Sequence, residues 1–586
     1  MTIFAGDQTD ARRLKEGRII PSGGYCDQPY VVKNSKGEWL CVMTTGEGEE
    51  GDRDQHIVAT ISSDRGETWT PLIDIEPMGP PESSWVTPFA TASGRIYVFY
   101  TYNGSNMERV IARYEWAAKR VDTLGDFVYK YSDDGGYTWS KERYTIPVRN
   151  FTIDLQNPYG GSVQFFWSVC KPIIHKDAVY IGLAKVGRFG DGFMESSEGA
   201  FVRSRNLLHE QDPAKVVWET LPDGADGLRA PSSDVADEHN LVSLSDGSLY
   251  CTYRTIEGHN CHAYSRDDGH TWTPPEHAVY SPNGRKIKHP RAANFVRKFK
   301  NGKYLLWFHN NGRDWSKDMT PELQSVPYQY RNPVWISGGV ERDGYIHWSQ
   351  PEIVLYDEEA SVRISYPDFV EEDDGQIYIT ETQKVTARVH RVDMDMLHKL
   401  WNQSCLREVS TDGLLISWER ESQQARGLAW TVSAEQERRS GFTIEMWISF
   451  DTLLPGETII QSQAAPGQGF VVRTGDKNTV SITLNDGTRE SVWDCDPEQL
   501  VTGKRHHLAI IIDQGPRLIS FVIDGVLCDG GPHRQFGFTH YDTDLQACIV
   551  SGNVTLHPEF SGVLHTLRVY NRHLLVSEAV SHYHAG

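Results

Sequence analysis

The sequence predicts an all-β protein, a six-bladed β-propeller followed by a β-sandwich. Three observations lead to this fold class. Short runs rich in Val, Ile, Tyr, Phe and Trp alternate with Gly, Asp and Asn turns, while helical periodicity is scarce. One eight-residue turn pattern recurs three times, and a two-strand unit recurs six times before residue 400. A different strand pattern begins near residue 414.

The recurring turn has the pattern Ser-x-Asp-x-Gly-x-Thr-Trp. It occupies residues 62–69, 132–139 and 265–272. The pattern predicts a tight turn, because Asp bonds its own backbone and Gly accepts a positive φ. The Trp then fills an apolar gap. We expect degenerate copies of the turn to end on Trp218 and Trp348.

The two-strand unit implies six blades, one for each copy. Each copy has an inner segment that runs into an apolar strand, then a turn and a second strand. The inner segments begin at Asp27, Trp85, Val169, Glu238, Lys288 and Ser365. Because the first strand of every propeller blade lines the central channel, one polar residue from each copy is expected at a common mouth. These residues are Gln28, Thr87, Lys171, His239, His289 and Tyr366.

The last part of the chain predicts a separate sandwich. Gly441–Phe450 alternates as a half-buried strand does, and further apolar strands follow at 506–513, 520–527 and 562–572. Their order over residues 410–586 resembles the laminin-G/concanavalin-like lectin sandwich, a jelly-roll fold. The resemblance identifies no ligand, so carbohydrate binding and a purely structural role both stay open. We expect residues 1–400 to form a catalytic propeller and residues 401–586 the concanavalin-like domain.

Composition excludes some classes of partner. The net charge of −21 argues against a nucleic-acid binder, and no apolar stretch is long enough to cross a membrane. The N-terminus has no apolar core typical of a signal peptide, which favours a cytoplasmic protein; secretion is the alternative if a signal has been removed. The nine cysteines have no Cys-x-x-Cys spacing, so we expect reduced, mostly buried thiols and no zinc site. The sequence does not indicate an oligomeric state.

The three turns resemble the Asp boxes (BNR repeats) of the sialidase superfamily, which lie on the outer hairpins of propeller blades. The resemblance implies a glycoside hydrolase in which a Tyr, activated by a Glu, attacks an anomeric carbon that carries a carboxylate. Three arginines clamp that carboxylate, because guanidinium groups bind it bidentately, and an Asp is the acid/base.

The matching segments assign these roles to residues of this chain. Residues 237–254 look like the segment that carries the Glu and the second arginine, which gives Glu238 and Arg254. Residues 331–348 look like the segment of the third arginine, Arg331. Residues 365–375 look like the nucleophile segment, with Tyr366 as the phenol and Asp368 beside it as a substrate-binding candidate. The acid/base falls in the loop 51–56, where Asp54 is the best candidate.

The chain departs from the family at the first arginine. The family has Arg-Ile-Pro in the first inner strand, whereas the register set by Pro29 puts Asp27 at the place of that arginine. The segment Arg18–Pro21 looks like the motif but lies too far upstream and has one residue too many. Asp27 would repel a substrate carboxylate, so we expect a related acidic sugar rather than ordinary sialic acid. Arg291 and Lys171 are the further candidate cations.

Four histidines fall on predicted mouth positions: His56, His239, His289 and His309. His289 and Arg291 are two apart on one strand and therefore face the same way. General acid/base catalysis, a metal held by imidazoles, and hydrogen bonding to sugar hydroxyls all remain open for them. We take His289 as the catalytic candidate and the other three as substrate-binding candidates.

Three functions follow from these residues. The first is an exo-acting glycoside hydrolase of the sialidase superfamily that uses Tyr366, Glu238 and at least two arginines on an acidic-sugar glycan. The second is a polysaccharide lyase that cleaves next to a uronic acid with a His/Tyr pair. The third is a non-catalytic carbohydrate-binding propeller. The expected partner is a carbohydrate, with no nucleic acid or membrane. No cofactor is required, and a divalent metal in the channel is an alternative.

Overall fold

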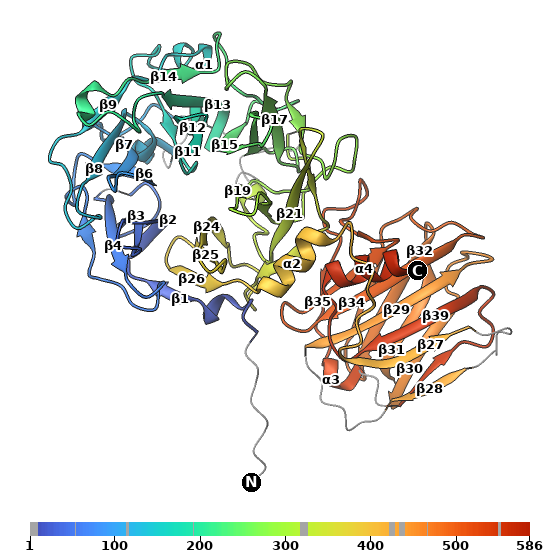
Figure 1. Ribbon diagram of the computed structural model, residues 1–586. Helices are drawn as coiled ribbons and strands as arrows, with labels where there is room; N and C mark the ends of the chain where they lie inside the picture. Colours follow the sequence, from blue (N-terminus) through green and yellow to red (C-terminus); the bar gives the residue numbers. More distant parts are fainter. Residues whose placement is uncertain are drawn as a thin grey trace. The chain divides into compact units, whose positions relative to one another are not determined.

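The computed structural model describes residues 10–52, 54–112, 117–190, 193–316, 326–420, 428–432, 440–465, 467–548 and 552–586. The chain forms two compact units, coloured blue to yellow and yellow to red in Figure 1. The first contains Met1–Trp348 and Glu359–Met394, and the second contains Ser349–Glu358 and Asp395–Gly586. Helix α2 (Met394–Asn402) spans the boundary expected at residue 400. Strand β23 (Glu352–Leu355) lies in the short segment that joins the second unit.

Six antiparallel sheets form a ring in the first unit, which confirms the six-bladed propeller (Figure 1). Most connections within a sheet are short, so consecutive strands pair with one another. The first three sheets are β2 (Tyr25–Lys33), β3 (Trp39–Gly46), β4 (His56–Ser62), β5 (Ile73–Asp74); β6 (Ser83–Ala90), β7 (Ile96–Tyr102), β8 (Asp126–Ser132), β9 (Tyr144–Ile146); and β10 (Phe166–Trp167), β11 (Ile173–His175), β12 (Ala178–Gly190), β13 (Phe193–Ser204), β14 (Glu219–Leu221). The last three are β15 (Asp237–Ser243), β16 (Leu249–Arg254), β17 (Cys261–Ser265), β18 (Glu276–His277); β19 (Phe295–Lys298), β20 (Tyr304–Phe308), β21 (Val334–Arg342), β22 (Tyr345–Trp348); and β24 (Ser365–Glu371), β25 (Ile377–Thr382), β26 (Ala387–Arg391) with β1.

Strand β1 (Arg18–Ile20) closes the ring. It pairs antiparallel with β26, with Arg18 opposite Val389, so the first strand of the chain completes the last sheet. Closure in this way joins the two ends of the propeller within one sheet. The segment Arg18–Pro21, which looks like the family's arginine motif, is therefore this closing strand.

The three Asp boxes have the same hydrogen bonds. In the first, Ser62 Oγ accepts from Gly66 N at 2.8 Å, and Asp64 Oδ1 accepts from Thr68 N at 2.9 Å. The corresponding bonds recur in the boxes that begin at Ser132 and Ser265. Each box joins the third and fourth strands of its sheet, where backbone donors would otherwise lack partners.

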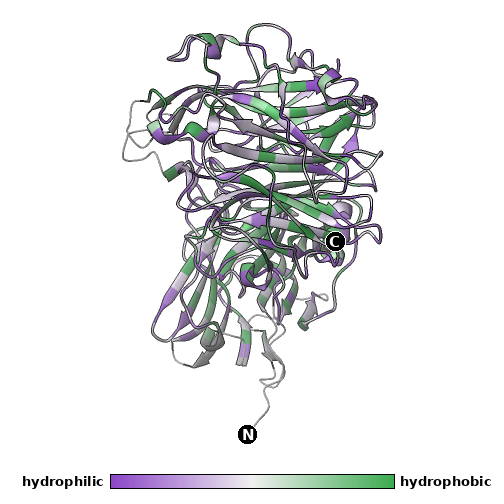
Figure 2. Cartoon of the chain, turned by 90° about the vertical axis from the view of Figure 1, so that its left-hand side faces the viewer, coloured by the Kyte–Doolittle hydropathy of each residue, from purple (hydrophilic) through white to green (hydrophobic). Residues whose placement is uncertain are grey.

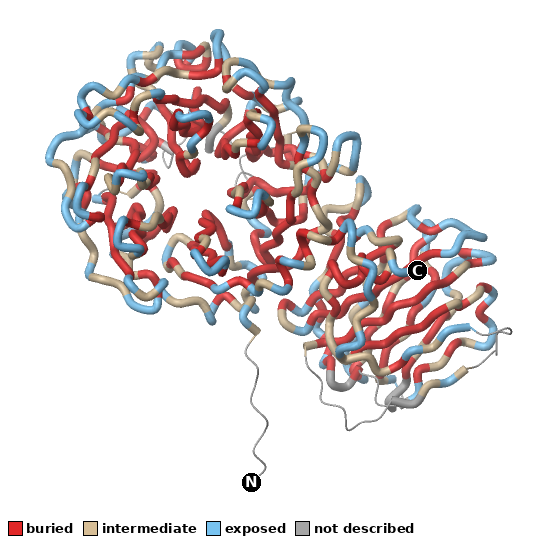
Figure 3. The backbone as a smooth tube through the Cα atoms, in the orientation of Figure 1, coloured by how far each residue is buried: buried red, intermediate tan, exposed pale blue. Residues whose placement is uncertain are grey.

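Apolar side chains on both faces of the sheets fill the space between neighbouring blades. Leu40 and Val42 of the first sheet pack with Ile96, Val98 and Tyr100 of the second. Figure 2 shows hydrophobic residues concentrated along the strands, and Figure 3 shows buried backbone in the sheets and exposed turns between them. Blade-to-blade burial of this kind stabilises the ring, because each large apolar side chain contributes about 1.5–3 kcal/mol.

The second unit contains two facing sheets, which confirms the predicted sandwich. Residues from both sheets, including Ile444, Phe470, Ile482 and Ile510, form one core. The first sheet contains β27 (Leu414–Glu419), β39 (Val563–Tyr570), β29 (Gly441–Ser449), β34 (Arg505–Asp513), β35 (Leu518–Ile523), β36 (Val526–Leu527) and β37 (Thr539–His540). The second contains β28 (Ala429–Val432), β38 (Gly552–Leu556), β30 (Thr458–Ala465), β31 (Gln468–Gly475), β32 (Thr479–Asp486) and β33 (Glu490–Asp494).

Helices are few and short. In the part of the chain that the structure describes, none is long and apolar enough to span a membrane. The α-helices besides α2 are α1 (Thr152–Leu155), α3 (Leu545–Cys548) and α4 (Val576–Ala585), and the 3₁₀ turns are η1 (Leu14–Glu16), η2 (Ala117–Lys119), η3 (Val121–Thr123), η4 (Pro213–Lys215) and η6 (Val326–Tyr328). All nine cysteines are unpaired thiols and eight are buried, as predicted.

Candidate active site

Four inner strands share one backbone distortion. In β2, β6, β15 and β24 a β-bulge interrupts the ladder to the next strand. One residue in each bulge has a positive φ: Gln28 (52°), Trp85 (62°), Glu238 (57°) and Tyr366 (49°). Such a conformation costs a non-glycine residue of order 1–3 kcal/mol and persists only where the surroundings hold it. Bulges re-aim side chains, and these four lie at equivalent positions of their blades.

Tyr366 and Glu238 meet in a buried pair. The Tyr366 hydroxyl donates to Glu238 Oε1 at 3.0 Å. Tyr366 is 4% exposed and Glu238 is 1% exposed, and Glu238 Oε2 has no hydrogen-bond partner among the described residues. Burial raises the pKa of the phenol, and the Glu238 carboxylate raises it further. Burial also raises the pKa of Glu238, while Arg254 opposes this. The pair therefore has a proton to transfer and a carboxylate that can take it.

Arg254, at the end of β16, holds Glu238 in place. Its Nη1 lies 2.7 Å from Glu238 Oε1, and its Nε donates to Asp237. Asp237 also lies 3.3 Å from Nη2 of Arg291. One carboxylate thus bridges two of the predicted substrate-binding arginines, which reduces the positive charge that they offer to a ligand.

Arg331 approaches from the fifth blade. Its Nη1 donates to Ser365 Oγ at 2.6 Å and its Nη2 to the carbonyl of Arg291 at 2.9 Å, while its Nε has no partner among the described residues. The ring of Tyr328 faces all three guanidinium groups. The distances from its centroid are 4.9 Å to Arg291 and 5.9 Å to both Arg254 and Arg331. The three arginines therefore converge on one aromatic ring, as cation–π contacts allow.

A lysine occupies the region of the missing first arginine. Lys384, in the turn between β25 and β26, pairs with Asp27 and lies 3.2 Å from Glu50 Oε2. Its Nζ is 4.1 Å from the centroid of the Tyr366 ring and 5.3 Å from that of Trp85. Asp27 also accepts from the hydroxyl of Tyr25 at 2.9 Å. Asp27 therefore binds a cation of the chain itself.

Carboxylates oppose most of the positive charge of this cluster. Among the described residues, the cations are Arg254, Arg291, Arg331 and Lys384, and the carboxylates are Asp27, Glu50, Asp237 and Glu238. Arg120 pairs with Glu50 and Asp122, and Arg363 adds a cation near Arg331. Arg331 keeps one buried N–H, at Nε, without a hydrogen-bond partner among the described residues. In the part of the chain that the structure describes, the arginines do not form the uncompensated clamp of three that the family resemblance implies.

The loop between β3 and β4 brings Glu50 to the cluster, whereas Asp54 lies exposed at its other end with a φ of 72°. Burial acts to raise the pKa of Glu50, but ion pairs with Lys384 and Arg120 lower it to about 2. Glu50 is therefore ionised at neutral pH and is a poor proton donor. The role of Asp54 as the acid/base remains a prediction.

Three other predicted site residues connect blades instead of joining the arginines. Lys171 Nζ lies 2.5 Å from Asp368 Oδ2, and the same oxygen accepts from Val31 N at 2.8 Å. Burial lowers the pKa of Lys171 to about 8, against the effect of Asp368. Gln28 Nε2 donates to the carbonyl of Ser168 at 2.8 Å. Lys171 and Asp368 pair with each other in the interior, which opposes the substrate-binding role predicted for them.

Two histidines predicted at the mouth pack elsewhere. His239 stacks on Tyr253 at 4.5 Å between centroids, and burial lowers its pKa to about 3. His56, on the third strand of its sheet, has its Nε2 3.2 Å from Asp74 Oδ1 on the outermost strand. The mouth positions predicted at His239 and Thr87 are wrong in register, because Glu238 and Trp85 are the bulge residues of β15 and β6.

His289 and His309 form a buried stack near the arginines. Their ring centroids are 5.8 Å apart, and both side chains are fully buried. His289 Nε2 bonds the carbonyl of Ala292 at 2.8 Å, and His289 Nδ1 accepts from His309 N at 3.3 Å. Burial lowers the pKa of His289 to about 3 and that of His309 well below its usual value. Since both nitrogens of His289 are engaged and the ring is neutral, the structure opposes an acid/base role for it.

Sequence reasoning missed several residues of the cluster. Tyr328 and Lys384 come from loops, and neither belongs to a motif; the nearest signal for Tyr328 is its place three residues before Arg331. The ring centroids of Trp85 and Tyr366 are 6.4 Å apart. The sequence points to Thr87 instead of Trp85, because Thr87 is the polar residue of that segment. Among the described residues, no group of three His, Cys, Asp or Glu side chains is disposed to hold a metal ion.

Comparisons with solved structures returned distant matches. A protein of unknown function from Dyadobacter fermentans is 15% identical with a TM-score of 0.45, covering 64% of this chain and 97% of its own. Trypanosoma rangeli sialidase is 12% identical with a TM-score of 0.42, covering 96% of this chain and 93% of its own. A Hadza microbial sialidase is 16% identical with a TM-score of 0.42, covering 63% of this chain and 66% of its own. No curated protein sequence matched the chain.

Family comparisons cover both units. Residues 426–579 match the concanavalin A-like lectin/glucanases superfamily, in agreement with the two-sheet sandwich. Residues 87–379, half of the 586-residue chain, match the BNR repeat-like domain. This match includes two of the three Asp boxes and the strands that carry Glu238 and Tyr366. The chain belongs to the BNR repeat-like domain family and carries a C-terminal concanavalin A-like domain.

Proposed function

We propose that this chain is a retaining glycoside hydrolase in which Tyr366 is the nucleophile and Glu238 is the base that activates it. One observation carries the proposal. The buried Tyr366 hydroxyl donates to Glu238 at 3.0 Å, and both residues sit in strained bulges that bring them together from the fourth and sixth blades. Strain maintained at two positions that meet is typical of functional sites. A phenol is also a neutral nucleophile, which suits attack beside a substrate carboxylate.

The reaction follows from this geometry in two steps. Glu238 takes the proton of the Tyr366 hydroxyl as the phenolate oxygen bonds to the anomeric carbon. The glycosidic C–O bond breaks, and its electron pair goes to the leaving oxygen, which takes a proton from an acid. Water then attacks the same carbon, the C–O bond to Tyr366 breaks, and the phenolate recovers the proton from Glu238. Lys384, 4.1 Å from the Tyr366 ring, stabilises the phenolate as it forms.

Asp54 is the acid in this proposal. Glu50 lies closer to Lys384, but its ion pairs with Lys384 and Arg120 hold it as a carboxylate in a structural role. Asp54 is four residues further along the same loop and is exposed, where a bound glycan would cover it. In the second step Asp54, now a carboxylate, accepts a proton from the attacking water.

Two substrate classes are consistent with the cluster. We propose an acidic sugar other than ordinary sialic acid, with its carboxylate held by Arg331 and the outer side of Arg254; the unpartnered Nε of Arg331 supports this. A neutral glycoside is the second candidate. The carboxylates that pair with Arg254, Arg291 and Lys384 favour it, because an uncharged sugar requires no excess of positive charge.

Proton NMR of the full chain with a panel of aryl glycosides tests this function. The panel includes sialic acid, other ulosonic acids, uronic acids and neutral hexoses. We expect hydrolysis of at least one member, with the anomeric configuration retained in the first product. Release of an unsaturated sugar without uptake of water would indicate the lyase, and saturation binding without turnover would indicate a binding propeller. An inverted first product would contradict the Tyr366 nucleophile.

A further inference from the structure

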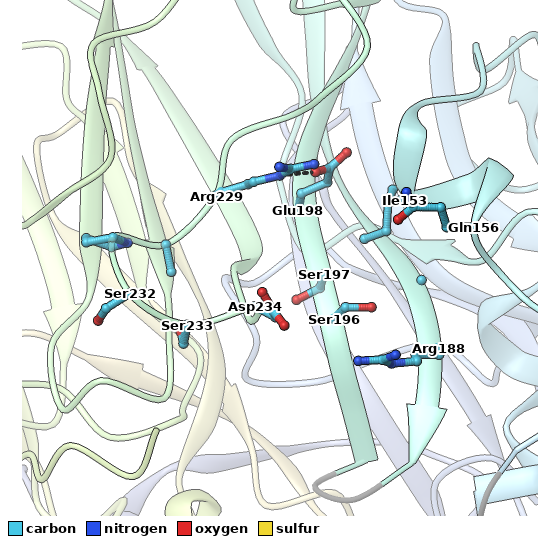
Figure 4. Close-up of a pocket in the computed structure, with 13 residues that line it drawn as sticks. Ile153, Gln156, Arg188, Ser196, Ser197, Glu198, Arg229, Ser232, Ser233 and Asp234 are labelled. Atoms are coloured by element: carbon cyan, nitrogen blue, oxygen red, sulfur yellow. Dashed lines mark hydrogen bonds and ion pairs between the residues drawn. The ribbon is translucent and has the colours of Figure 1, made fainter. Parts of the chain in front are cut away.

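A cavity lies in the propeller, lined by residues other than those of the Tyr366 cluster. It has a volume of about 480 Å³ and opens between β13 and the segment 229–234, with Ile153 and Gln156 of the α1 region on a third side (Figure 4). The volume is within the range of pockets that bind small molecules. Segment 229–234 leads directly into β15, which begins with Asp237 and Glu238. The cavity and the catalytic pair therefore share one stretch of backbone.

Glu198 is a buried acceptor in the wall of this cavity. It is 1% exposed, and its Oε2 accepts from Arg229 Nε at 2.7 Å. Its Oε1 is buried and accepts no hydrogen bond of good geometry from the described residues. Burial raises the pKa of this carboxyl, while Arg229 and the backbone amide of Gly227 lower it. Leaving such an oxygen unpaired costs about 1–3 kcal/mol, so a ligand that donates to it gains that energy on binding. Figure 4 shows Glu198 joined to Arg229, with Ser196, Ser197, Asp234 and Arg188 along the same cavity.

The opposite wall is held in place before any ligand arrives. The backbone amides of Ser232 and Ser233 donate to Glu257 Oε1 at 3.0 and 2.7 Å. Glu257 Oε2 in turn lies 2.7 Å from His277 Nε2. Ser197 N donates to the carbonyl of Asp234 at 2.8 Å, which ties this wall to β13. A wall that is already ordered loses little conformational entropy on binding.

The charges around the cavity disfavour an anion. Arg229 is paired with Glu198 and Asp226, and Arg188 with Glu195 at 3.0 Å. Asp234 adds a further carboxylate, so acidic groups outnumber the two arginines. The hydroxyls of Ser196, Ser232 and Ser233 complete the polar lining. Carboxylate acceptors, a guanidinium donor and hydroxyls together match neighbouring sugar hydroxyls, each of which both donates and accepts.

We propose that this cavity is a subsite for an uncharged, hydroxyl-rich sugar unit, whose hydroxyl donates to Glu198 Oε1. The assignment of that sugar to the glycan cleaved at Tyr366 rests on the proposed function. The subsite makes the enzyme selective for oligosaccharides over single glycosides, because a second sugar contributes binding energy away from the reacting bond.

Saturation-transfer NMR tests the subsite with lactose, N-acetyllactosamine and maltotriose as probes. The measurements use the full chain with Tyr366→Phe, so that no turnover intervenes. Two further changes address the cavity: Glu198→Gln removes the acceptor charge, and Ser232→Trp fills the space from an exposed position. Ser93→Trp, at an exposed serine in the turn between β6 and β7, is the matched control.

We expect saturation of at least one probe, at least about tenfold weaker binding in both cavity variants, and no change in the control. Absence of saturation for every probe would overturn the subsite, as would equal binding in Ser232→Trp and the control. Failure of the proposed function has a separate readout. If Tyr366→Phe still turned over substrate, Tyr366 would not be the nucleophile, and the measured sugar binding at the cavity would be unaffected.

Discussion

The outer turns and the inner strands of the propeller repeat in opposite ways. The three Asp boxes repeat their side chains, and Ser, Asp, Gly and Thr make the same hydrogen bonds in each copy. The four bulged inner strands repeat their backbone, and the residue in the strained position differs every time: Gln28, Trp85, Glu238 and Tyr366. The repeated side chains of the Asp boxes stabilise the turns. The repeated bulges place different side chains at equivalent positions, where they are available for chemistry.

The outer Asp boxes and the inner strands also differ in how fully their carboxylates are hydrogen-bonded. Both oxygens of Asp267 in the third box accept hydrogen bonds, and the pKa of that carboxyl is lowered although burial acts to raise it. Glu238 keeps one oxygen without a partner, and burial raises its pKa. A satisfied carboxylate stabilises a turn, and a partly satisfied buried one is available for proton transfer.

Replacing Tyr366 by Phe gives the largest expected effect. Loss of the nucleophilic hydroxyl should lower kcat by about 10²–10⁴-fold or more, with little change in melting temperature. Steady-state kinetics and thermal unfolding measure the two quantities. Tyr30→Phe is the matched control. Tyr30 lies in β2 two residues after the bulge residue Gln28, and its hydroxyl donates to the backbone carbonyl of Val169 at 2.9 Å. It should cost about 1 kcal/mol of stability and leave kcat nearly unchanged.

The Asp267→Ala change in the third box tests the opposite side of the comparison. It removes the acceptor for Thr271 N at 2.8 Å and for the Thr271 and Ser265 hydroxyls. The free energy of unfolding should fall by about 2–3 kcal/mol, while kcat per folded molecule stays unchanged. Chemical denaturation and kinetics on the same preparation measure both. A loss of kcat without a loss of stability would break the distinction between outer and inner repeats.

Lys384→Met probes the cation beside the nucleophile. We expect kcat to fall about tenfold and the acidic limb of the pH–rate profile to move to higher pH, because the phenolate loses a stabilising charge 4.1 Å from its ring. Lys36→Met is the control, since Lys36 lies 4.7 Å from the ring of Tyr137 in the second Asp box. A similar pH shift in both variants would show that the effect is not local to the site.

The pH dependence of the outer turns gives the smallest effect. Bonds from the side chain and backbone of Thr68 lower the pKa of Asp64 from 3.8 to about 2. The folded state therefore binds that proton less tightly than the unfolded state, so the stability from Asp64 is present above 3.8 and is lost as the pH falls toward 2. The stability gap between the wild type and Asp64→Asn should shrink from about pH 6 to about pH 3. A gap that stays constant would contradict this assignment.

Local chemistry determined what the sequence could predict. An Asp box is held by bonds among residues at most four apart, so its pattern predicts the turn. The blade count follows from the six copies of the two-strand unit. The family resemblance predicted Glu238, Arg254, Arg331 and Tyr366 as members of one cluster, because each lies in a recognisable sequence segment.

The remaining residues depend on features without a local pattern. A bulge shifts a strand's alternation, so counting along the chain selected Thr87 and His239 in place of Trp85 and Glu238. Tyr328 and Lys384 reach the cluster from loops whose conformation is set by distant contacts. Lys171 and Asp368 have residue types suited to substrate binding, and only the fold shows that they pair with each other.

The most direct test of the account is chemical trapping of the nucleophile. A fluorinated, activated glycoside of the sugar that the enzyme cleaves should accumulate as a covalent adduct, and peptide mass spectrometry locates it. We predict the adduct on Tyr366, with none in Tyr366→Phe and slower formation in Glu238→Gln. An adduct on a carboxylate, or turnover without an adduct and with inversion at the anomeric carbon, would contradict it.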